Sequence, residues 1–114
     1  MSYTNLTYLK NITDGNKEVI GEIVAMFAKQ VPEFVQNFNR FYQSGQFEAL
    51  GKEAHKAKSS LQILGMSELE KEMKVLQLKA IEGKEPESYL LHIRHFEEQC
   101  KAAIDELEQE LGRL

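Results

Sequence analysis

His55 combines the features of a nucleophile that another protein could reach. If its segment is helical, with about 100° between residues, His55 points largely away from the apolar stripe that would face a core. Gly51 and Ser59, one turn before and one turn after it, are small and would leave space around the ring. Lys58 places a cation on the neighbouring turn. Such an imidazole could accept a phosphoryl group and hold it.

The residues after His55 form a spaced pattern: Lys at the third following position, Ser at the fourth and fifth, and Gly at the tenth. These are Lys58, Ser59, Ser60 and Gly65. The pattern resembles the histidine-containing phosphotransfer (HPt) domain of bacterial two-component phosphorelays. The family more often has Gly where this chain has Ser59, which is also small but adds a hydroxyl.

The similarity covers nearly the whole chain. Leu6-Thr7-Tyr8-Leu9 looks like the family's short first helix. Phe27 and Pro32 stand where the family often has a Phe and a Pro in a long second helix. One departure is Gln46, where many members have an Asp as the helix N-cap. That difference concerns helix stability and leaves the chemistry unchanged.

The resemblance implies a role for His55 and Lys58. In the family, the histidine Nε2 atom takes a phosphoryl group from an aspartyl phosphate of a receiver domain, and the group later moves to the aspartate of another receiver. Lys58 would stabilise the negative charge on the modified ring. The expected partners are response-regulator receiver domains and a hybrid sensor histidine kinase. The receiver would supply the divalent metal, so this chain is expected to bind no cofactor.

Four further residues are candidates for partner binding or for clearance around His55. Gly51 should cost about 1 kcal/mol inside a helix, which suggests that space is needed there. Ser59 would serve by being small. Gln62 could hydrogen-bond the phosphate or the partner, or be an ordinary solvated glutamine. Ile63 projects off the apolar stripe and is a docking candidate.

Apolar residues at helical spacing predict a short first helix and four longer ones. The expected helices are residues 4–12, 17–43, 46–64, 67–82 and 86–111, with a bend near Pro32 and a capping box starting at Ser67. The short connections favour antiparallel neighbours. The predicted fold is an all-α, up-down four-helix bundle with a short additional N-terminal helix, forming one domain over residues 1–114.

The periodicity also predicts which residues face the core. In the helix that carries His55, the inward residues are Leu50, Ala54, Ala57, Leu61 and Leu64. The aromatic stripe of the second helix is expected to be mostly core, with a part left exposed for docking; it comprises Phe27, Phe34, Phe38 and Phe41. Val75 and Leu78 fit the inward stripe of the fourth helix poorly.

Composition excludes several classes of function. The net charge of −4 argues against nucleic acid as a partner, because phosphate backbones bind to basic patches. No apolar run approaches the roughly 20 residues of a membrane span, and residues 1–5 lack a signal-peptide pattern. With a single cysteine there is no internal disulfide. We expect a cytoplasmic monomer, and the initial Met weakly favours a free-standing protein over a piece of a kinase.

Other chemistry-bearing residues form no convincing site. His92 and His95 are three apart, but no third ligand has suitable spacing, so they are interpreted as exposed surface histidines and no metal is expected. Cys100 is interpreted as a small buried hydrophobe. No phosphate-binding glycine-rich loop is present, so the chain should not use ATP by itself.

Two hypotheses from different classes remain. The first is a phosphorelay intermediate that is phosphorylated on His55. The alternative is a helical adaptor that binds a receiver or another signalling protein without being phosphorylated. A metal-binding bundle would need carboxylates and histidines on its core faces, whereas the core stripes here are aliphatic and aromatic.

Overall fold

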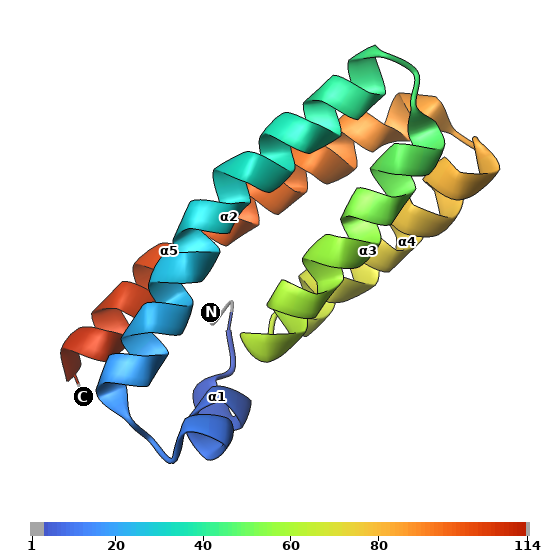
Figure 1. Ribbon diagram of the computed structural model, residues 1–114. Helices are drawn as coiled ribbons and strands as arrows, with labels where there is room; N and C mark the ends of the chain where they lie inside the picture. The colour runs from blue at the N-terminus through green and yellow to red at the C-terminus, as the bar shows by residue number, and fades with distance from the viewer. Residues whose placement is uncertain (1–3, 114) are drawn as a thin grey trace.

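Four long helices form an antiparallel bundle with a short helix at one end (Figure 1). The computed structural model describes residues 4–113. Its elements are α1 (Leu6–Thr13), α2 (Lys17–Gln43), α3 (Phe47–Ile63), α4 (Ser67–Glu82), the 3₁₀ turn η1 (Pro86–Ser88) and α5 (Tyr89–Arg113). The pairs α2/α5 and α3/α4 run side by side, and α1 lies near the end of α3 (Figure 1). The predicted all-α bundle with an added N-terminal helix is confirmed.

The helix boundaries agree with the sequence expectation to within a few residues, with two local corrections. Helix α4 has Met66 at its N-cap position and no side-chain cap bond, so the predicted capping box at Ser67 is wrong. The last helix opens as the 3₁₀ turn before α5 begins at Tyr89. Asn16 caps α2, because its side-chain oxygen accepts a hydrogen bond from the Val19 amide.

Gly65 closes α3 and also allows the N-terminal segment to pack there. Its φ is +70°, a conformation that L side chains rarely adopt. A Cβ added at this position would lie 2.6 Å from the Asn5 carbonyl oxygen. The Asn5 amide donates a 3.1 Å hydrogen bond to the Leu64 carbonyl. The glycine therefore permits a backbone contact as well as a helix stop.

The core lies along the bundle axis and follows the predicted stripes. All five predicted inward residues of α3 are buried, as are Phe27, Phe34 and Phe38 of α2. Val75 and Leu78 are 43% and 52% exposed, in line with their poor fit to the α4 stripe. The sequence reading missed Tyr89, which is fully buried and whose hydroxyl donates to the Lys79 and Lys84 carbonyls.

Candidate functional site

His55 lies in the middle of α3 and is exposed. Its preceding neighbour Ala54 and Ala57, two residues further on, are fully buried, and this burial fixes the rotation of α3 about its axis. The imidazole makes no hydrogen bond or ion pair with any residue that the structure describes. Its two ring nitrogens are therefore open to an incoming group.

The residues following His55 leave its surroundings open on one side. Ser59, one turn on, is exposed, and so is Gln62 at the next turn. Neither side chain has a hydrogen-bond partner among the described residues. Ser60 instead points to the other side of α3, where its hydroxyl donates to the Gln30 side-chain oxygen at 3.0 Å. Ser59 and Gln62 therefore share the face of His55, as the helical spacing predicts.

Gly51 does not provide clearance toward solvent, which corrects the sequence expectation. It is buried against α4. A Cβ at this position would lie 2.8 Å from the Ile81 Cγ1 atom and 2.9 Å from the Gln77 carbonyl oxygen. Its missing side chain therefore allows α3 and α4 to approach closely one turn before His55. The helical register of α4 decides this, and the sequence of α3 alone does not reveal it.

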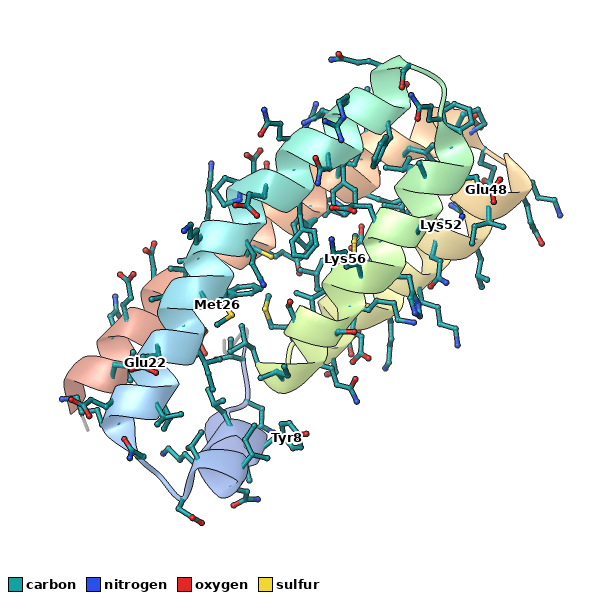
Figure 2. All side chains as sticks on the ribbon, viewed as in Figure 1. Tyr8, Glu22, Met26, Glu48, Lys52 and Lys56 are labelled. Atoms are coloured by element: carbon teal, nitrogen blue, oxygen red, sulfur yellow. The ribbon has the colours of Figure 1, made fainter. Side chains whose placement is uncertain are left out.

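The lysines of α3 make the surroundings of His55 positive. Lys58 is half-buried and has no ion-pair partner among the described residues. Lys52 and Lys56 project from the exposed side of the helix (Figure 2). Lys52 lies 3.6 Å from a carboxylate oxygen of Glu48, but both side chains are about three-quarters exposed, so this pair contributes little. An anion on His55 would meet a positive local potential.

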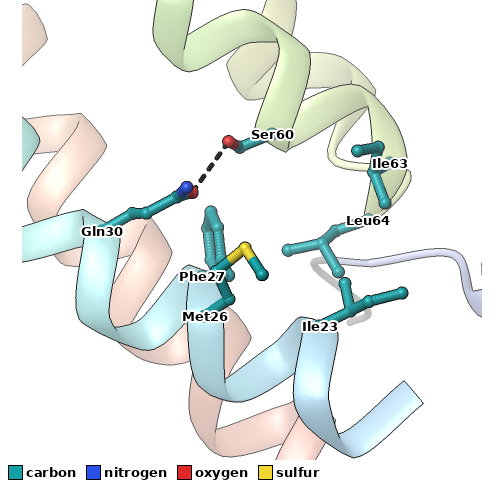
Figure 3. A pocket seen from close by; sticks show the side chains of 7 residues that line it. All are labelled: Ile23, Met26, Phe27, Gln30, Ser60, Ile63 and Leu64. Carbon is teal, nitrogen blue, oxygen red and sulfur yellow. Dashed lines mark hydrogen bonds between the residues drawn. The ribbon is translucent and has the colours of Figure 1, made fainter. Parts of the chain in front are cut away.

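An apolar pocket of about 110 Å³ lies between α2 and α3, and we call it the α2–α3 groove (Figure 3). Met26 and Ile63 form exposed parts of its wall, at 59% and 37% exposure. Phe27 is 3% exposed, so the aromatic stripe contributes to the wall of this groove and otherwise belongs to the core. Seven residues line the groove: Ile23, Met26, Phe27, Gln30, Ser60, Ile63 and Leu64.

Sequence reasoning identified Ile63 as a docking candidate but missed Met26 and Gln30. The available signal was their spacing on α2: each lies one helical turn from Ile23 or Phe27, on the side that faces α3. That signal becomes specific only when the packing of α2 against α3 is known.

The other two histidines belong to a contact between α4 and α5. The Nδ1 atoms of His92 and His95 lie 2.9 Å and 3.0 Å from the same carboxylate oxygen of Glu72. The His92 side chain is only 14% exposed, so its interpretation as a surface histidine is wrong; His95 is 42% exposed. The correction has a physical cause, because the packing of α4 on α5 covers His92.

Neither these histidines nor Cys100 offers a second reactive site. Among residues 4–113, no group of three or more His, Cys, Asp or Glu side chains is arranged to hold a metal ion. Cys100 is fully buried, and burial raises the pKa of its thiol to about 12. A thiol that stays protonated at neutral pH is a poor nucleophile.

A profile of the family described as "Hpt domain" matches residues 22–111 of the chain. This match covers all of α3, with His55, and of α4, and most of α2 and α5. The chain belongs to the Hpt domain family. Membership supports a role in phosphotransfer and signal transduction, and Hpt domains generally interact with receiver domains and kinases.

A search of curated proteins and a search of solved structures found no match to the chain. None of the helices within residues 4–113 combines the length and the hydropathy of a membrane-spanning segment.

Proposed function

We propose that this Hpt domain is a phosphorelay intermediate that carries a phosphoryl group on His55. The observation that supports the proposal is an exposed imidazole, held at mid-helix in a chain of this family, that has no partner within residues 4–113. Lys58 supports it further, because a cation one turn away that forms no ion pair with the described part of the chain can interact with the added charge. The remaining histidines are already engaged with Glu72.

The proposed reaction moves one phosphoryl group between two proteins. The lone pair of the unprotonated ring nitrogen attacks the phosphorus of an aspartyl phosphate on a receiver domain. The new N–P bond forms as the P–O bond breaks, and the aspartate leaves as a carboxylate with the electron pair. The second transfer reverses these roles on another receiver. Phosphoryl transfer depends on positioning and charge stabilisation, so the carrier needs an accessible nitrogen and a nearby cation.

Each residue around His55 would have its own role in phosphoryl transfer. Lys58 would stabilise the phosphoryl charge, and the receiver would contribute the divalent metal. Ser59 would leave space for the partner, while Gln62 would hydrogen-bond the phosphate or the partner. Gly51 would act indirectly by holding α3 close to α4.

The α2–α3 groove is the proposed docking surface for the receiver. It lies on the side of α3 that faces α2, and its residue Ile63 is about two helical turns beyond His55. Its exposed wall is apolar, with Met26 and Ile63 available for contact. Burial of apolar side chains would provide affinity, while the phosphate chemistry stays at His55. We further propose that the chain acts as a cytoplasmic monomer between a hybrid sensor kinase and a response regulator.

The test is transfer of radioactive phosphoryl from a phosphorylated receiver domain. Wild-type chain should gain acid-labile label, located on His55 by mass spectrometry, and His55→Gln should gain none. His92→Gln is the matched control and should be labelled like wild type. Equal labelling of His55→Gln and wild type would contradict the proposal. Receiver binding without label in the wild type would favour the adaptor function instead.

A further inference from the structure

Lys74 on α4 occupies the same face of the bundle as His55. The contact at Gly51 fixes how α3 and α4 are aligned. A Cβ at Gly51 would meet both the Gln77 carbonyl oxygen and the Ile81 amide nitrogen, so Gly51 lies level with residues 77–81 of α4. The two helices are antiparallel and follow each other through the turn at Gly65.

The axial level of His55 follows from this alignment. His55 is four residues beyond Gly51, which is a displacement of about 6 Å at 1.5 Å per residue. On the antiparallel α4, the same displacement leads back to residues 73–77. Lys74 therefore lies at the level of His55 on the neighbouring helix, and packed helices have axes about 8–10 Å apart.

The burial pattern fixes the direction in which each side chain points. On α4, Met73 is fully buried and Lys74 is about 100° further round, on the side of Gln77, which faces α3. On α3, Ala54 is fully buried and His55 is likewise about 100° further round, on the side of Gly51, which faces α4. Because the helices are antiparallel, both rotations lead to the same outer face of the α3–α4 pair.

No carboxylate of the described residues pairs with the ammonium group of Lys74, so its charge can act on an added anion. The side chain is exposed and makes no hydrogen bond or ion pair with the described residues. Glu70, one turn earlier on α4, does not approach it within ion-pair distance. Lys71, by contrast, lies 3.6 Å from Glu68, and Lys79 lies 3.7 Å from Glu85.

We propose that Lys74 completes the phosphoryl site from α4, so that an anion on His55 lies between Lys58 and Lys74. The lysine chain is long enough to span the distance between adjacent helices. Two cations on different helices would surround the phosphoryl oxygens from two sides, which one lysine on α3 cannot do. The inference rests on the proposed function of His55 and adds a second, independent helix to its site.

The test compares Lys74→Gln with Lys71→Gln, which removes the same charge from the same helix. The first measurement is the fraction of phosphoryl carried by His55 at equilibrium with a phosphorylated receiver. Lys74→Gln should lower the equilibrium constant for phosphoryl transfer from the receiver to His55. The expected decrease is about two- to fivefold, the range of an exposed charge pair. Lys71→Gln should have the same equilibrium constant as wild type. Lys74→Arg keeps the positive charge and should therefore also have an equilibrium constant close to that of wild type. The difference should shrink at 1 M salt, where charges are screened.

The second measurement is a ³¹P titration in the absence of the receiver, so it does not depend on contacts with that partner. In the isolated phosphorylated chain, the ³¹P signal should titrate about half a pH unit higher in Lys74→Gln than in Lys71→Gln, because a nearby cation stabilises the more charged phosphoryl form. Identical behaviour of these two variants in both measurements would overturn the role of Lys74 and leave His55 as the carrier. Absence of label on wild-type His55 would instead overturn the carrier function itself.

Discussion

The three histidines of this chain fall into two contrasting environments. His55 stands on the outside of α3 and has no partner among the described residues. His92 and His95 share the carboxylate of Glu72 across the α4–α5 contact. The Nε2 atom of His92 is buried and has no hydrogen-bond partner in residues 4–113. One environment leaves the ring free to react, and the other uses it to join two helices.

This difference teaches that accessibility separates the proposed carrier histidine from the two histidines that join helices. A nucleophilic nitrogen needs a lone pair that nothing else occupies and a path for the incoming phosphorus. Each ring nitrogen of His92 fails one of these conditions. The Nδ1 atom is in contact with Glu72, and the buried Nε2 atom leaves no path for an incoming group. His95 is intermediate, because it contacts the same carboxylate but is 42% exposed on its side chain.

The largest expected contrast is in chemical reactivity. With diethyl pyrocarbonate, which acylates unprotonated imidazole nitrogens, His55 should react more than about tenfold faster than His92, with His95 between them. The reason is that the reagent must reach a free nitrogen, and opening the α4–α5 contact requires local unfolding. Peptide mass spectrometry at short reaction times measures each rate. Equal rates for His55 and His92 would mean that the contact with Glu72 does not persist in solution.

The histidines also show what the sequence can and cannot predict. His55, Ser59 and Gln62 were correctly placed on an exposed face, because helical periodicity within α3 decides it. The contact of His92 with Glu72 depends on how α4 and α5 are aligned, and nothing local in either segment encodes that alignment.

The same limit explains the error at Gly51 and the omission of Tyr89. Gly51 was assigned to the open face by its spacing from His55, whereas its function is set by Gln77 and Ile81 on another helix. Tyr89 precedes the clear apolar periodicity of α5, and carbonyls near the α4–α5 connection satisfy its hydroxyl. Periodicity predicts faces, and contacts between helices need the assembled bundle.

The next largest expected contrast is in stability, between Ala substitutions at Gly51 and at Ser59, one turn before and one turn after His55. Gly51→Ala should destabilise the chain by up to about 2 kcal/mol, because overpacking costs about 1–3 kcal/mol and the gain in helix propensity offsets about 1 kcal/mol of it. Ser59→Ala should change the free energy of unfolding by less than about 0.5 kcal/mol, as is usual for an exposed position. Urea denaturation followed by circular dichroism measures both.

The outcome decides how the two small residues contribute. A stability loss only in Gly51→Ala would establish close packing of α3 on α4 as its role. If Gly51→Ala were instead as stable as wild type but slower in accepting phosphoryl groups, the clearance function first expected for Gly51 would be reinstated.

The smallest expected effect tests the structural pair of histidines. Glu72→Ala removes the carboxylate that both rings contact and should lower the free energy of unfolding by about 1 kcal/mol, the usual net contribution of such a hydrogen bond. Glu68→Ala, one turn away on α4, is the matched control. Its side chain is 88% exposed, so its loss should have little effect.

Labelling of His55 in Glu72→Ala separates stability from function. The variant should accept phosphoryl groups like wild type, because the hydrogen bonds of Glu72 join α4 to α5, whereas His55 is carried by α3. A loss of labelling without a loss of stability would show that the α4–α5 contact influences the carrier face, and the division between a reactive and a structural histidine site would then fail. Unchanged labelling together with a measurable loss of stability would establish that the two sites are independent.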